Sequence, residues 1–258
     1  MNSIRIYWVA FTTILIKEIR RFTRIWAQTL LPPAITMALY FVIFGNLIGS
    51  RIGEMGGFKY MQFIMPGLIM MSVITNSYSN VTSSFFSSKF QKSIEEMLVA
   101  PVPSWVILSG YVLGGVTRGL LVGLIVTVLA LFFTELTVHN LFITITIVFL
   151  TAVLFATGGF INALFARSFD DVTIIPTFVL TPLTYLGGVF YSIHLLPEFW
   201  QKASLFNPVL YMVNTFRYGI LGVSDINPWA ALAAICVFIV LLFGLALWLL
   251  EKGKGLRQ

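Results

Sequence analysis

The chain has 258 residues, of which 58% are hydrophobic and 10% are charged, and its net charge is +6 at pH 7. A water-soluble domain needs more charged side chains to cover its surface, so this composition excludes one and indicates a polytopic membrane protein. The single cysteine, Cys236, excludes a disulfide framework and a cysteine metal cluster.

Residues 3–25 are predicted to form an amphipathic helix. Its apolar residues recur at steps of three and four, and four basic residues fall on or beside the opposite face. We expect this helix to lie along an anionic membrane surface, although it could simply be a basic flank that orients the first span. The apolar stripe consists of Ile4, Trp8, Phe11, Leu15, Ile19, Phe22 and Trp26.

Apolar stretches of about 20 residues or more predict membrane spans, because a helix rises about 1.5 Å per residue. Residues 192–202 are too polar to cross a bilayer and too apolar for a plain loop, and Asn207-Pro208 breaks the segment before residues 209–218. We therefore expect one all-α transmembrane domain over residues 1–258, with a broken re-entrant segment before the last span. The six predicted spans cover about residues 27–48, 60–86, 105–133, 141–165, 172–191 and 229–250.

An even number of spans puts both termini on one side of the membrane. Arg51, Lys59, Lys202 and Arg217 fall on the opposite side, and Arg118 lies inside a span. Because cytoplasmic loops carry the excess of Lys and Arg, we expect both termini in the cytoplasm. The remaining basic residues, all on the terminal side, are Arg5, Lys17, Arg20, Arg21, Arg24, Lys89, Lys92, Arg167, Lys252, Lys254 and Arg257.

The cytoplasmic stretch from Lys89 to Pro103 is the best candidate for contact with a partner protein. It combines a narrow apolar helical face with charges of both signs, and its prolines end the helix before span three. A helix that rests on lipid headgroups is the alternative, but such a helix would be mostly basic. The candidate contact residues are Lys89, Lys92, Ile94, Glu95, Glu96, Leu98 and Pro101.

Two features inside the spans are candidates for a substrate path. Span two carries serines together with Asn76 and Asn80 on one helical face, which favours helix packing or a hydrated route. Span three carries Arg118, and no Asp or Glu falls within the predicted spans to pair with it. Its partner would be backbone carbonyl groups at a helix break, water, or an anionic substrate headgroup. Glycines at steps of about four along span three mark a close helix contact instead.

Several kinds of chemistry are not supported by the sequence. It lacks the G-x-x-x-x-G-K-[ST] loop, so the chain does not bind ATP by that route. His139 and His194 have no paired ligands, which makes a metal site improbable. The absence of intramembrane carboxylates also weakens the alternative of an ion-coupled secondary transporter or channel.

One stretch resembles the signature of the ABC-2 type permeases. It has leucines at positions 180, 183 and 186 before Gly187, followed by Pro197, Pro208 and Arg217. The stretch 95–102 is similar to the cytoplasmic coupling segment of that family. Val209 departs from the pattern, since a larger residue is expected there. The signature residues of the re-entrant segment are Gly187, Gly188, Pro197, Pro208, Tyr211 and Arg217.

This resemblance implies the membrane subunit of an ATP-driven exporter in the bacterial cytoplasmic membrane, not an enzyme in itself. It implies a homodimer with contacts around residues 40–44 and 181–188, bound to two copies of a separate ATPase that docks on residues 89–101. ATP and Mg²⁺ would be bound by that ATPase, and this chain would hold no cofactor and no nucleic acid. Relatives export drugs, lipid-linked saccharides and polymers.

Overall fold

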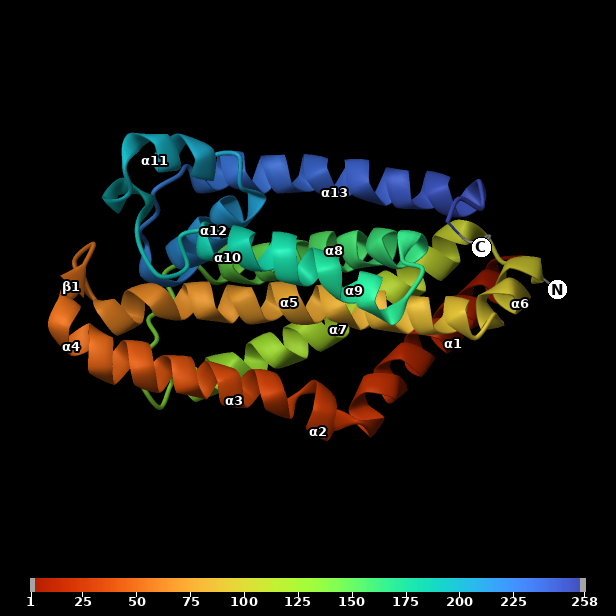
Figure 1. The fold of residues 1–258 in the computed structure, drawn as a ribbon, viewed down its shortest axis with the longest axis horizontal. Helices are drawn as coiled ribbons and strands as arrows, with labels where there is room; N and C mark the ends of the chain where they lie inside the picture. Colours follow the sequence, from red (N-terminus) through yellow and green to blue (C-terminus); the bar gives the residue numbers. More distant parts are fainter. Residues whose placement is uncertain (1–2, 256–258) are drawn as a thin grey trace.

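The structure is a computed structural model that describes residues 3–255. Its helices run roughly along one long axis (Figure 1). Both ends of the chain and α6 lie at one end of this bundle, and α4, β1 and α11 lie at the other (Figure 1). We call these the terminal end and the opposite end.

The described chain is mostly helical, as predicted. It also contains a two-stranded antiparallel hairpin in which Glu54 pairs with Lys59 and Met55 with Phe58. The elements in order are α1 Ser3–Arg24, α2 Trp26–Thr29, α3 Leu31–Tyr40, the π-helix η1 Phe41–Ile48, α4 Gly49–Ile52, β1 Glu54–Met55, β2 Phe58–Lys59, α5 Tyr60–Phe90, α6 Ser93–Val99, α7 Ser104–Ala130, α8 Leu141–Phe165, α9 Phe169–Ile175, the π-helix η2 Pro176–Leu180, α10 Thr181–Tyr185, the 3-10 turn η3 Ile193–Leu195, α11 Glu198–Ser204, α12 Pro208–Leu221 and α13 Pro228–Glu251.

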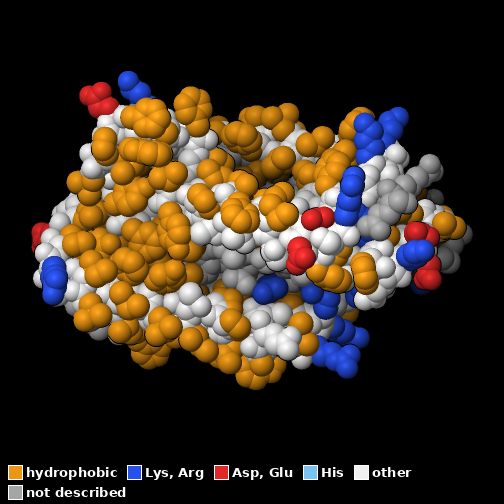
Figure 2. Space-filling view, viewed as in Figure 1, with side chains coloured by type: hydrophobic (Ala, Val, Ile, Leu, Met, Phe, Trp, Pro, Cys, Tyr) orange, Lys and Arg blue, Asp and Glu red, His pale blue; other side chains and the backbone are white. Residues whose placement is uncertain are grey.

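Four helical stretches within the described residues are long and apolar enough to cross a membrane: Trp26–Ile52, Ser104–Ala130, Leu141–Phe165 and Pro228–Glu251. α5 has the length, but its serines and asparagines dilute its apolar character. Hydrophobic side chains cover the middle of the molecular surface, and most charged ones gather toward its two ends (Figure 2). The chain is thus an all-α, multi-pass membrane protein, and the number of six spans stays a prediction.

Several predicted segments have different bounds in the structure. The stretch predicted over 27–48 continues to Ile52, and the helix predicted over 105–133 ends at Ala130. The helix predicted over 60–86 continues to Phe90, because Lys89 is buried against the end of α8 instead of facing solvent. The segment predicted over 172–191 begins earlier, at Phe169, where Ser168 caps the helix. It ends at Tyr185, six residues earlier than predicted.

Proline and glycine explain the interruptions between α9 and α11. Pro176 begins a π-helical turn, and a proline lacks the N–H that a regular helix needs. Past Tyr185 the chain turns at Gly188, whose φ of 71° lies in the left-handed region that favours glycine. The short helices η3 and α11, which carry polar and charged side chains, follow in place of a continuous membrane span.

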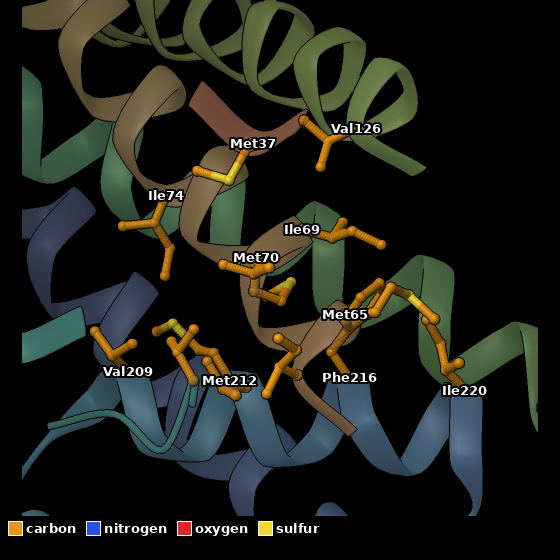
Figure 3. Close-up of a cluster of buried hydrophobic side chains, with 14 of the residues drawn as sticks. Met37, Met65, Ile69, Met70, Ile74, Val126, Val209, Met212, Phe216 and Ile220 are labelled. Atoms are coloured by element: carbon orange, nitrogen blue, oxygen red, sulfur yellow. The ribbon is translucent and has the colours of Figure 1, made fainter. Parts of the chain in front are cut away.

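Two apolar clusters form the core. One is centred toward the opposite end, where methionines of α5 meet side chains of α12, while Met37 of α3 lies nearer Val126 of α7 (Figure 3). Met65 and Met70 of α5 face Met212 and Phe216 of α12, so α12 is packed into the bundle (Figure 3). The second cluster, around Phe85, holds α5, α7 and α8 together toward the terminal end.

The glycines of α7 are packing positions, as predicted. A Cβ at Gly114 would lie 2.5 Å from the Cβ of Glu18, so one side of α7 lets α1 approach closely. A Cβ at Gly115 or Gly119 would collide with Val81 or Ser77 of α5. Small residues therefore bring α1 and α5 against α7 from two directions, which places their polar side chains close together.

Candidate functional site

The predicted coupling stretch contains a short helix, α6, tied between α5 and α7. Ile94 is 2% exposed and packs into the second core cluster, so it anchors α6 and does not face a partner. Glu95 and Glu96 are exposed, as is Leu98, and neither carboxylate forms a salt bridge within the described residues. The outer face of α6 is thus a small acidic and apolar surface, held rigidly, while Pro101 follows the helix as predicted.

Lys89 is a correction to the predicted contact set. Its side chain is buried, and its Nζ donates hydrogen bonds to the carbonyl oxygens of Leu164 and Ala166 at 2.7 and 2.8 Å. These carbonyls belong to the last turn of α8, which has no further amides to bond them. Lys89 therefore joins two helices, while Lys92 remains exposed at a turn with φ of 60°.

Substituting these two lysines should give opposite results. Lys89→Ala leaves two buried carbonyls unbonded and is expected to lower the free energy of unfolding by about 1–3 kcal/mol. Lys92→Gly relieves a left-handed backbone position and is expected to be neutral or stabilising. Thermal unfolding of the purified protein measures both, and equal effects would contradict the assignment.

The predicted path residues belong to a polar cluster where α1, α5 and α7 meet. We call Glu18, Arg21, Asn76, Asn80, Ser84 and Arg118 the polar cluster. Glu18 is fully buried and accepts a hydrogen bond of 2.6 Å from Ser84. Arg21 lies 3.5 Å from Glu18 and donates to the side-chain oxygen of Asn80 at 2.8 Å and to its backbone oxygen at 3.0 Å.

Arg118 reaches the same cluster from α7. Its Nη2 donates to the backbone oxygen of Thr29 at 3.1 Å and to the side-chain oxygen of Asn76 at 3.2 Å. Thr29 ends α2, where the chain bends before Pro32 and Pro33 begin α3. Both a carbonyl at a helix break and an asparagine of span two thus hold Arg118, and the structure brings Asn76, Asn80 and Arg118 together.

Glu18 was missed from the sequence. The sequence signal was that Glu18 is the one acidic residue of α1 and precedes Arg21 by three residues. It also lies four residues from Ile14 and from Phe22, which the structure shows to be buried. That spacing puts it on the face that packs against the bundle. Ile4 and Trp8 of the predicted apolar stripe are exposed instead, as a membrane-facing surface requires.

At the opposite end, Arg217 joins three parts of the chain. It is 1% exposed, donates to the carbonyl oxygen of Gly188 at 2.6 Å and of Phe63 at 3.3 Å, and stacks over the Phe63 ring at 3.9 Å. Asn214, one turn earlier on α12, contacts it at 3.4 Å. Arg217 thus supplies the hydrogen bonds that the irregular turn after α10 lacks.

The other signature residues shape the same broken segment. A Cβ at Gly187 would lie 2.7 Å from Cγ1 of Val209, so the glycine and this smaller side chain fit together. Pro208 begins α12, and Asn207 caps it while donating to the carbonyl oxygen of Leu183 at 2.6 Å. The remaining two signature residues are Pro197 and Tyr211. Pro197 precedes α11, and the hydroxyl of Tyr211 donates to the carbonyl oxygen of Leu205 at 2.8 Å.

A helical bundle of this kind, with a tethered helix at one end and an arginine-fixed break at the other, fits the membrane domain of a transporter. The family model of the ABC-2 type transporters matches residues 9–221, and the chain belongs to that family. It is therefore a transport permease subunit in a membrane.

Two relatives agree with this. The chain is 60% identical over 254 residues to the inner membrane transport permease YadH of Escherichia coli K12, which covers 98% of this chain and 99% of that protein. It is 26% identical over 215 residues to nodulation protein J of Rhizobium leguminosarum bv. trifolii, which covers 83% of this chain and 82% of that protein. A multi-pass protein this similar to an inner membrane permease is itself an inner membrane protein.

Proposed function

We propose that this chain is the membrane subunit of an ATP-driven exporter whose ATPase is a separate protein. The observation that carries the proposal is α6: a short helix, anchored by Ile94 and exposed at Glu95 and Glu96, that connects two long helices. A push on such a helix moves α5 and α7 together. The sequence has no phosphate-binding loop of its own, so ATP and Mg²⁺ would be held by the partner.

In this arrangement two copies of the chain bind two copies of the ATPase. Both termini and α6 face the cytoplasm, six spans cross the membrane, and α11 and α12 form the re-entrant segment at the outer side. The dimer contact runs along residues 40–44 and 181–188. Support comes from Val42, Ile43 and Tyr185, which leave apolar surface exposed along these segments. The cargo, a drug, lipid-linked or saccharide-type molecule, leaves the cell.

Affinity purification of the tagged chain from membranes of its native host tests the proposal. We expect a two-plus-two complex with an ATPase that carries a phosphate-binding loop and hydrolyses ATP. Mass measurement of the intact complex gives the stoichiometry. Purified chain that moves a substrate into liposomes without ATP or a partner would contradict the proposal.

A further inference from the structure

Two positive charges of the polar cluster lie close together inside the bundle. Arg21 bonds Asn80 and Arg118 bonds Asn76, and these asparagines are one helical turn apart on α5. The two guanidinium groups therefore bond to neighbouring turns on one face of α5. Glu18 lies beside Arg21 and offsets one charge, and no carboxylate within the described residues pairs with Arg118.

The same cluster holds buried polar atoms without hydrogen-bond partners in the described part of the chain, and they include one acceptor, Oε2 of Glu18, which lies 3.5 Å from Nε of Arg21. Nδ2 of Asn80 and Nε of Arg118 are buried and have no partner among the described residues. Asn80 itself is 0% exposed. Buried polar groups in proteins nearly always find a partner, so unpaired donors beside an uncompensated charge indicate a missing acceptor. An anion supplies both the acceptor atoms and the charge.

The surroundings indicate that this anion carries an apolar body. Arg118 is only partly buried, and it bonds the carbonyl oxygen of Thr29 at the end of α2. The neighbouring α2 and α3 expose the apolar side chains of Trp26, Leu31 and Ile35. A partly exposed arginine next to exposed apolar surface suits a molecule with an anionic head and a hydrocarbon part.

We propose that Arg118, Asn80 and Arg21 form a binding site for a phosphate-type anion, such as the headgroup of an amphiphile that enters from the membrane. Guanidinium groups match the geometry of phosphate oxygens, and Asn80 adds an amide donor. The inference rests on the proposed function in that it names the class of cargo, an anionic amphiphile.

Asn80→Asp tests this site, and Arg118→Gln keeps the test decisive if a second buried carboxylate near Glu18 destabilises the chain. Asn80→Asp keeps the oxygen that accepts from Arg21, and it removes an amide group that makes no hydrogen bond. It replaces a free donor with a negative charge, which repels an anion. Arg118→Gln removes the uncompensated charge, and Arg51→Gln, at an exposed position on α4, is the matched control for charge.

The measurement is the dissociation constant of short-chain phosphatidylglycerol and of short-chain phosphatidylcholine for the purified full-length chain. We expect the anionic lipid to bind at least about tenfold more tightly, a difference of about 1.4 kcal/mol. Asn80→Asp and Arg118→Gln should reduce the ratio to about one, while Arg51→Gln keeps it. Equal affinities in the unsubstituted chain, or a preserved preference in Asn80→Asp, would overturn the proposal.

Competition with glycerol 3-phosphate distinguishes the source of the anion. Displacement of the lipid at similar concentration assigns the site to a soluble phosphate, and displacement only at about 100-fold higher concentration assigns it to an amphiphile. Retention of the ATPase is scored separately on the same proteins. A chain that retains the ATPase but shows no anion preference refutes this site alone, and one that binds the anion but retains no ATPase refutes the proposed function alone.

Discussion

The double substitution Glu95→Lys, Glu96→Lys is expected to weaken binding of the partner ATPase by about 100-fold, or about 2.7 kcal/mol. Both carboxylates are exposed on α6 and free of salt bridges within the described chain, so their charge is available to a partner. A partner surface that binds acidic side chains is itself basic, so it repels the introduced lysines at a cost of several kcal/mol. The fraction of ATPase retained on the tagged permease, and the ATP hydrolysed per complex, measure the effect.

The control is Glu198→Lys, which reverses an exposed charge on α11 at the opposite end of the bundle. It should leave ATPase retention unchanged. Because Ile94 and not the glutamates anchors α6, the double variant should also unfold at the same temperature as the unsubstituted protein. Full retention of the ATPase by a folded double variant would remove the assignment of α6 as the docking helix.

Arg217→Leu is expected to lower the free energy of unfolding by about 3–5 kcal/mol. The loss comes from the carbonyl oxygens of Gly188 and Phe63, which stay buried without donors, and from the stacking on the Phe63 ring. Arg217→Lys keeps the charge but not the planar group that bonds two carbonyls at once, so it should be intermediate. Thermal unfolding in detergent, followed by tryptophan fluorescence, measures both.

The control for Arg217 is Arg51→Leu, at an exposed position of the same end of the molecule. A surface substitution of this kind changes stability by about 0.5 kcal/mol or less. If Arg217→Leu were as stable as Arg51→Leu, the broken segment would be held by its apolar contacts alone.

The helices could be predicted because their signals are local. α8 spans Leu141–Phe165, the predicted range, since a polar loop with a capping Asn140 precedes a continuous apolar run. The glycine spacing on α7 likewise predicted close packing, because it repeats on one helix. Each of these features depends on residues near one another in the chain.

The polar cluster and the role of Lys89 could not be predicted in the same way. Lys89 bonds carbonyls more than 70 residues later, and Glu18 bonds Ser84 from a helix expected to touch only the membrane surface. Such partners are set by how the helices pack, which the pattern of one helix does not contain. Arg118 was recognised as needing a partner, and the structure supplies Thr29 and Asn76.

Labelling of single cysteines in whole cells tests the central claim, that α6 faces the cytoplasm where a partner ATPase can reach it. Cys236 is first replaced by Ser, and then Val99→Cys on α6, 87% exposed as valine, is compared with Glu198→Cys on α11. With a maleimide that does not cross the inner membrane, we predict labelling at position 198 in intact cells and at position 99 only after that membrane is permeabilised. Labelling at position 99 in intact cells would contradict the account.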